Sequence, residues 1–352
     1  RQSFRKMDAA VKIPLRCRSI GRKMCALYWN RPVSILPQIL VFDRSGHDVF
    51  SQIVSLIGTH LMVPLAFLVF LGKIPKNRLA ILCWFYLTLF YIGYIYLTGA
   101  WDWLGYYVRY VWIAGLAFAV YRAFRNGRRA PWLPKRSFRS WAGVIFLFAL
   151  GTVFLMITVG SYYGRYYAEE PMELQFPLKD GVYYVAHGGS QPIVNYHNEY
   201  LPQQYALDIV KLNAWGFRAR GFYPDDLHRY AIYGDRIYSP CRGTVISATD
   251  GFDDRTPSDF ANGLPEGTPA AGNHVVIACG GAQVYVAHMQ KGSVRVKAGE
   301  VVDGNTWIGN VGNSGNTSEP HLHLHAEKDG TGVPVTFGGR FLVRNSLIRS
   351  TE

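Results

Sequence analysis

The chain has 352 residues, of which 49% are hydrophobic, 15% aromatic and only 17% charged. So low a charged fraction is unusual for a soluble protein and indicates a membrane portion. The net charge of +13 comes from the first half alone: residues 1–165 hold 22 Lys and Arg against 4 Asp and Glu, and residues 166–352 hold 15 against 20. No nucleic-acid-binding motif accompanies this charge, so we expect no nucleic-acid partner and attribute it to membrane topology.

Residues 1–49 are predicted to form a basic, irregular N-terminal tail. The chain opens with Arg1 rather than Met, which fits a processed or incomplete start, and no signal-peptide pattern follows. Cys17 and Cys25 have no metal-type partners nearby in the sequence and are interpreted as ordinary thiols.

Residues 50–160 are predicted to form a membrane domain of three to four helices, because each apolar stretch is near the ~20 residues that a helix needs to cross a bilayer. The stretches are Phe50–Leu71, Leu79–Thr98, Trp103–Tyr121 and Trp141–Gly160. The second and fourth hold no charged residue. The third contains Arg109, which is unfavourable in a bilayer unless it reaches the interface or a partner. The alternative, buried helices of a soluble protein, is disfavoured by four such stretches.

Lys and Arg predict the orientation of these helices, because cytoplasmic loops carry an excess of both residues. The connection Lys73–Arg78 holds three and Arg122–Arg139 holds seven, so both are expected in the cytoplasm. The Gly99–Asp102 connection and everything after Ser161 are then outside. Whether Phe50–Leu71 spans stays open, since a full span places the basic tail outside and a partial insertion keeps it inside.

The second half of the chain changes in character. Residues 161–182 are predicted as a linker, residues 183–345 as an all-β domain and residues 346–352 as a tail. Gly, Pro, Asn and Asp separate short apolar runs there, a pattern typical of many short strands. Examples of these runs are Thr244–Ile246, Val275–Ile277 and Val284–Val286.

Three histidines alternate with two leucines in Pro320–His325. In a β-strand, alternate side chains point to opposite faces, so His321, His323 and His325 share one face and the leucines point into a core. A row of imidazoles is a surface for metal binding or proton transfer. The turn-forming segment Gly312–Thr317 is expected to aim this strand. The alternative is a solvated strand face with chance histidines.

A metal site needs further ligands, and the β domain offers His197, Asp208 and His288. Zinc binds imidazole nitrogen and carboxylate oxygen, and a catalytic zinc site uses three protein ligands plus water. His197, Asp208 and one strand histidine supply such a set. Spacing alone does not choose among them, because His197 also fits a loop residue, Asp208 a turn or cap, and His288 a strand end.

Four sequence blocks together resemble the lysostaphin-type, or LytM-type, zinc peptidases of peptidoglycan. The blocks are Asn195–Ile209, with its Gln-x-Ala-Leu-Asp-Ile ending, Tyr238–Val245, Gly272–Met289 and Gly309–Leu324. They cover about residues 180–345, and the membrane half has no such match. The resemblance implies an all-β peptidase domain of antiparallel sheets with the lysostaphin-like duplicated hybrid motif. The expected fold class is therefore multi-domain, with an α-helical transmembrane N-terminal half and this C-terminal domain.

The resemblance also implies a role for each candidate residue. His197, Asp208 and His323 correspond to the ligands of a Zn²⁺ cofactor. His288 and His321 correspond to the two catalytic histidines beside the metal, one taking a proton from water and the other donating to the developing oxyanion.

This sequence departs from the family pattern in two places. Ten residues separate His197 from Asp208, where the commonest members have three, and Lys211–Ile237 is a long insert. The long gap with its Gln-x-Ala-Leu-Asp ending also resembles a longer-gap variant of the family. His197 is the least secure ligand, and His187 is its substitute.

Two other histidines have expected roles outside the metal. His325 is interpreted as a structural residue or a support of the ligands, with binding in place of His323 as the alternative. His274 lies where aromatic residues are usual in the family, and we expect it to pack.

Cys241 and Cys279 stand at the start and the end of two predicted strands. If those strands pair antiparallel, the two thiols come close and an oxidising compartment permits a disulfide. Two buried thiols are the alternative.

The function implied by the resemblance is that of a membrane-anchored zinc metalloendopeptidase. Its substrate is expected to be the peptide part of peptidoglycan, in stem peptides or cross-bridges. We expect a multi-pass protein of the bacterial inner membrane with the peptidase domain outside the cytoplasm, on the periplasmic or outer face. The partners are then peptidoglycan peptide and the lipid bilayer, and a regulatory membrane partner is a further candidate.

Two alternatives belong to other classes. The domain can be a non-catalytic module that binds peptidoglycan or regulates wall hydrolases, or a zinc carboxypeptidase on the same polymer. A transporter is weakly supported, because Arg109 is the only charge within a predicted span and a tether is sufficient.

Overall fold

The structure is a computed structural model, and it describes residues 49–73 and 77–351. The predicted N-terminal tail, apart from its last residue, lies outside the described residues, and so do the interpretations of Cys17 and Cys25.

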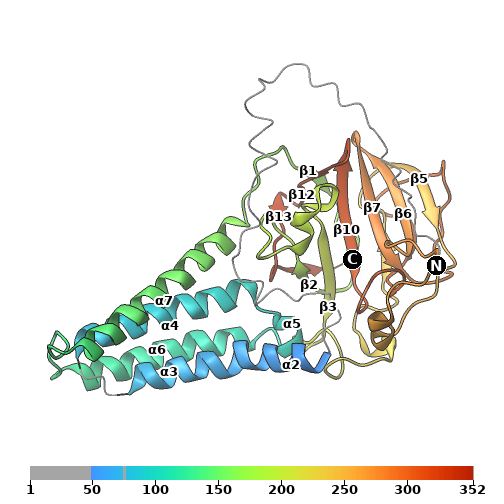
Figure 1. Cartoon of the computed structure of the whole chain (residues 1–352). Helices are drawn as coiled ribbons and strands as arrows, with labels where there is room; N and C mark the ends of the chain where they lie inside the picture. The colour runs from blue at the N-terminus through green and yellow to red at the C-terminus, as the bar shows by residue number, and fades with distance from the viewer. Residues whose placement is uncertain (1–48, 74–76, 352) are drawn as a thin grey trace, which may run out of the picture. The chain divides into compact units, whose positions relative to one another are not determined.

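The first half of the described chain is helical (Figure 1). The elements are α2 (Val49–Ile57), a π-helical turn (Gly58–Met62), α3 (Val63–Gly72), α4 (Arg78–Thr98), α5 (Trp101–Leu104), α6 (Val108–Gly127) and α7 (Phe138–Tyr163). Within this part, three helical stretches are long and apolar enough to cross a membrane: Ser51–Gly72, Arg78–Thr98 and Phe138–Tyr163. The helices that could span a membrane are thus confirmed by length and composition.

The third predicted stretch, Trp103–Tyr121, differs from the expectation. The chain breaks at Gly105, which has a φ of 92°, so that α5 ends before it and α6 begins only at Val108. Helix α6 carries three arginines, which lower its hydropathy, and it is not among the three long apolar stretches.

Side-chain caps explain where two of the helices begin, and Arg109 is stabilised by contacts with helix α4. Asn77 caps α4 by accepting a hydrogen bond from the backbone of Ala80, and Ser137 caps α7 in the same way. The Arg109 side chain is buried against the helix α4 residue Tyr96, donating to its carbonyl at 2.7 Å with the guanidinium 3.6 Å from its ring. The buried charge therefore has partners within the protein.

The second half is a mostly antiparallel β domain, as predicted. Its large sheet has the strand order β14-β2-β3-β10-β7-β6-β5-β8, and β11 pairs with β10. Strands β1, β12 and β13 form a small sheet in which β1 and β12 are parallel, and β4 pairs with β9. The strands are β1 (Met172–Leu174), β2 (Gly181–His187), β3 (Leu207–Leu212), β4 (Arg236–Tyr238), β5 (Gly243–Thr249), β6 (Asn273–Cys279), β7 (Ala282–Met289), β8 (Val301–Val302), β9 (Trp307–Asn310), β10 (Leu322–Lys328), β11 (Thr331–Val333), β12 (Val335–Phe337), β13 (Arg340–Phe341) and β14 (Leu347–Ser350).

The sheets extend beyond the predicted domain limits of 183–345. Strand β1 lies in the predicted linker and β14 in the predicted tail, where it pairs antiparallel with β2. Both strands are short, and neither shows a long alternating pattern that would mark it in the sequence.

Strand β10 lies between β3 and β7 in the large sheet (Figure 1). The side chains of Leu322 and Leu324 are fully buried in the main hydrophobic core of the domain. The alternation predicted for Pro320–His325 is therefore present, because the leucines form the core and the histidines are left for the opposite face.

The β domain is joined to the end of helix α4 by hydrogen bonds. Arg344 donates to the carbonyl of Thr98 at 2.6 Å, and the amide of Asn345 donates to Leu97 at 2.8 Å. The last carbonyls of a helix have no partner within the helix, so these side chains act as its cap. The buried Tyr184 of β2 adds a hydrogen bond to Asn345.

The open question about the cysteines is answered by the structure. Cys241 and Cys279 form a disulfide with a Cα–Cα distance of 6.1 Å. Strands β5 and β6 pair antiparallel, which brings the start of one to the end of the other.

Candidate metal centre

Strand pairing brings the candidate residues to one place. In the β10–β3 ladder, His323 lies directly opposite Asp208, and in the β10–β7 ladder it lies opposite Ala287. His288 follows Ala287 at the end of β7, so residues far apart in the sequence meet at the centre of the sheet.

His197 comes from the loop between β2 and β3, on a short 3-10 helix, Tyr196–Glu199, with Asn195 as its N-cap. The Asn195 side chain is fully buried and bonds three backbone carbonyls, which fixes the loop between β2 and β3. The long gap before Asp208 is therefore an ordered loop that returns His197 to the sheet.

His197, Asp208 and His323 form a compact set of donor atoms. The Nε2 atom of His197 is 3.0 Å from Oδ1 of Asp208, and Nδ1 of His323 is 2.9 Å from the same oxygen. One donor atom from each residue lies within 4.8 Å of the others, and all three side chains are buried. Two imidazoles and a carboxylate are the donor set that zinc prefers, so the residues fit this ion.

The two nitrogens of His323 have different neighbours. Nδ1 faces Asp208, whereas Nε2 is 3.0 Å from Nδ1 of His325. If Nε2 donates its proton to His325, the lone pair of Nδ1 is directed at the donor set. Metal-binding histidines are commonly oriented by a hydrogen bond of this kind at the second nitrogen.

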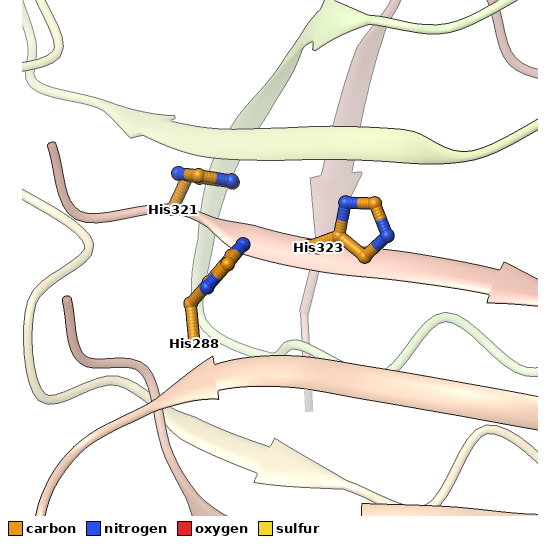
Figure 2. Close-up of side chains that lie close together, drawn as sticks. All are labelled: His288, His321 and His323. Carbon is orange, nitrogen blue, oxygen red and sulfur yellow. The ribbon is translucent and has the colours of Figure 1, made fainter. Parts of the chain in front are cut away.

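A second group, His288, His321 and His323, shares one residue with the first. Figure 2 shows the rings of His288 and His321 turned toward each other, and their centroids are 4.9 Å apart. Nδ1 of His288 donates to the carbonyl of Ser314, and Nδ1 of His321 to that of Glu319, each at 2.9 Å. In the neutral form of either ring the proton is then on Nδ1, and Nε2 is the nitrogen that can accept a proton.

The backbone at His288 is held in an uncommon conformation. Its φ is 61°, and it is one of four non-glycine residues with a positive φ among those described. Such positions cluster at functional sites, where the surrounding structure imposes them. The backbones at Gly272 and Gly315, next to His288, pack closely because neither residue has a Cβ. A Cβ on Gly272 would lie 2.3 Å from Ser314.

Burial and neighbouring charges set the protonation of the site. Burial lowers the pKa of His323 to about 4, and it lowers the pKa of His288 well below its usual value. Burial by itself would raise the pKa of Asp208, but the charges of His197 and His321 outweigh it and hold that pKa well below the usual value. At neutral pH the rings of His288 and His323 are therefore neutral and Asp208 is a carboxylate.

The remaining sequence candidates lie outside both donor groups. His187 contacts the ring of Tyr196 and the Arg344 side chain. His274 bonds its own loop at the Gly272 carbonyl. The geometry thus favours His197 over His187 as the ligand, and it leaves His325 as a support of His323.

The sequence interpretation missed Tyr196. Its hydroxyl donates to Oδ2 of Asp208 at 2.9 Å, so it contacts a proposed ligand directly. Its position next to His197 is the only signal in the sequence that could have identified it.

Residues 228–335 match the sequence model of peptidase family M23. This segment is an M23 peptidase domain. The match covers less than half of the chain, and it includes His288, His321 and His323 but begins after His197 and Asp208. No curated protein matches the chain.

Several solved structures are similar to part of this chain at low identity. A protein of Pseudomonas aeruginosa described as a peptidase M23 is 19% identical with a TM-score of 0.27, over 52% of this chain and 57% of that one. A zinc containing peptidase from Vibrio cholerae is 19% identical with a TM-score of 0.23, over 36% and 48%. The catalytic domain of lysostaphin from Staphylococcus simulans is 18% identical with a TM-score of 0.18, over 37% and 82%. The chain spans only about half the length of the first two, and the M23 assignment rests on the family model.

Proposed function

We propose that this protein is a membrane-anchored zinc metalloendopeptidase that hydrolyses peptide bonds in peptidoglycan stem peptides or cross-bridges. The observation that supports this most directly is the convergence of five buried side chains on one face of the central strands. His197, Asp208 and His323 would hold the zinc ion, and His288 and His321 would act on the substrate. The M23 segment supports a metallopeptidase related to peptidoglycan.

A bound zinc ion would supply Lewis acidity and lower the pKa of a coordinated water to ~7. The protein side chains account for the rest of the proposal. His288 and His321 each keep the proton on Nδ1 and direct an unprotonated Nε2 toward the site. One can accept the proton of the attacking water at Nε2. The other, after taking up a proton from solvent at Nε2, can donate a hydrogen bond to the oxyanion that develops on the scissile carbonyl.

The membrane part of the proposal is supported by the three apolar helices and by the charge distribution. The arginine-rich segment after α6 is assigned to the cytoplasm. The α4–α5 connection and the β domain are assigned to the opposite side, and Tyr184 of the β domain hydrogen-bonds to Gly99 and Trp101. The Cys241–Cys279 disulfide supports an oxidising compartment for the β domain.

The test is zinc content together with digestion of purified peptidoglycan by the full-length protein in detergent. We expect about one zinc ion per chain, loss of activity on chelation and recovery on adding zinc. The masses of the products separate an endopeptidase, which opens cross-links, from a carboxypeptidase, which releases single terminal residues. Binding of peptidoglycan by the zinc-loaded protein without any product would contradict the proposal and favour a non-catalytic module.

A further inference from the structure

The insert between β3 and β4, residues 213–235, lies against the connection between helices α4 and α6. Tyr106 donates its backbone N–H to Gly216 at 2.9 Å, and Arg218 donates its own to Asp102 at 3.0 Å. Gly216 has a φ of 83°, and a Cβ there would lie 2.9 Å from the Tyr106 nitrogen. The two backbones thus approach as closely as they do because this residue is a glycine.

Arg218 carries the contact from the helices into the β domain. Its side chain is only 2% exposed, and its Nε lies 2.7 Å from Oε2 of Glu319. The same Nε is 3.9 Å from Oδ2 of Asp102, and the guanidinium lies 3.5 Å from the ring centroid of Trp103. A buried charge needs such partners, so Arg218 ties the α5 residues to Glu319.

Glu319 is directly connected to His321. Its carbonyl accepts the Nδ1 proton of His321 at 2.9 Å, and it also accepts the hydroxyl of Thr317 at 2.9 Å. Glu319 precedes Pro320, which confines its backbone to extended conformations. A shift of Glu319 would therefore move the acceptor that orients the His321 ring.

A second contact runs in parallel with the first. Tyr223 of the insert stacks on Trp103 with ring centroids 5.5 Å apart, and its hydroxyl donates to the carbonyl of Ser318 at 3.0 Å. Trp103 thus contacts both insert side chains that reach the Ser318–Glu319 segment, Arg218 and Tyr223.

We propose that the α4–α6 connection is a structural part of the candidate active site. Asp102 and Trp103 hold Arg218, and Arg218 fixes Glu319 so that His321 keeps its proton on Nδ1 and its Nε2 toward the substrate. This inference rests on the proposed peptidase function for its effect on rate. The four residues are positioning residues, and the helical half does more than tether the peptidase domain.

The first test compares variants of the full-length protein in detergent on purified peptidoglycan. In Arg218→Met and in Trp103→Leu we expect kcat to fall by about 10- to 100-fold, with KM and zinc content unchanged, because a small displacement of a catalytic group has an effect of this size. Arg218→Lys keeps the charge and should recover part of the rate. Arg220→Met is the matched control, since Arg220 lies in the same insert with an exposed side chain.

The second test is hydrogen exchange of the backbone amides in residues 317–321, which needs no catalysis. We expect faster exchange in Arg218→Met and Trp103→Leu and wild-type exchange in Arg220→Met. Trp103→Leu leaves no buried charge unpaired, and it decides the question if Arg218→Met does not fold. Wild-type exchange of this segment in Trp103→Leu overturns the inference. If the wild-type protein cleaves no peptidoglycan but the two variants still show faster exchange than wild type, only the proposed function is contradicted.

Discussion

The helical and β regions bury polar side chains in different ways. In the described helices, the buried charged groups Arg109 and Asp102 have separate partners. Arg109 bonds one carbonyl and packs on aromatic rings, and Asp102 lies near Arg218 of the insert. In the β domain, His197, Asp208 and His323 each bring one donor atom to within 4.8 Å of the other two.

This difference indicates which groups serve structure and which serve chemistry. A buried polar group that lies against one carbonyl or one opposite charge does not form part of a set of donor atoms for an ion. Two imidazole nitrogens beside one carboxylate oxygen can bind a shared ion. Each of the three atoms has a lone pair, and a metal ion accepts all of them at once. The comparison therefore assigns chemistry to the β domain and structural roles to the isolated polar groups of the helices.

The largest effect is expected from removing a proposed ligand. Asp208→Ala or His323→Ala takes one donor from a three-residue set, so zinc binding and hydrolysis should both be lost, with at least about a 1000-fold fall in activity. Zinc content and product release on purified peptidoglycan are the two measurements. His274→Ala is the matched control, because that residue is a β-domain histidine outside both donor groups. Hydrolysis retained in either ligand variant would contradict the assignment.

A smaller effect distinguishes the two overlapping histidine groups. If His197, Asp208 and His323 hold the ion, His288→Ala and His321→Ala should keep zinc but lose about 100- to 10,000-fold in kcat, the usual contribution of a positioned acid or base. Zinc content of each purified variant is the deciding measurement. Loss of zinc in both variants, with zinc kept in His197→Ala, would instead favour the all-histidine group.

Much of this site could be predicted from the sequence because its pattern is local. The alternation around His323 specifies which side chains share a face, and the surrounding blocks carry the family resemblance. The pairing of His323 with Asp208 follows once β10 and β3 are adjacent in the sheet. The helices that could cross a membrane were predictable for a similar reason, since length and hydropathy alone define them.

The parts that could not be predicted depend on contacts between distant segments. The sequence near Arg218 does not identify Glu319 or Asp102 as its partners, because a buried ion pair between distant residues leaves no repeating sequence pattern. The start of α6 was also missed, since the apolar stretch continues through Gly105 while its left-handed backbone interrupts the helix. The short strand β14 has too few residues to show alternation.

His325 offers a test of the support given to the ligand His323. His325→Phe keeps a ring against Tyr285, on which the imidazole now stacks, but it removes the acceptor for Nε2 of His323. We expect zinc affinity to fall by about 10- to 100-fold, the typical effect of losing such a hydrogen bond, with the fold unchanged. Competition with a zinc chelator measures the affinity. A complete loss of zinc would indicate that His325 is itself a ligand.

The pH dependence of stability follows from the buried imidazoles. The folded-state pKa of His323 is about 4, below the ordinary value of 6.5, so between these values the unfolded chain binds more protons than the folded one. The stability from keeping this ring neutral is present above pH 6.5 and is lost as the pH falls through about 4. The melting temperature of the metal-free protein should therefore drop across this window, and the drop should be smaller in His323→Phe.

The smallest effect is expected from an isolated polar group in the helices. Arg109→Met removes a cation–π contact of about 1–2 kcal/mol and the hydrogen bond to Tyr96, so the melting temperature in detergent should fall by a few degrees. Zinc content should stay at the wild-type level, because no donor atom of the site is touched. Arg125→Met is the control on the same helix, where the side chain is exposed and lies against Tyr121. If Arg109→Met abolished zinc binding while Arg125→Met did not, polar groups in the helices would have to be counted as part of the metal centre.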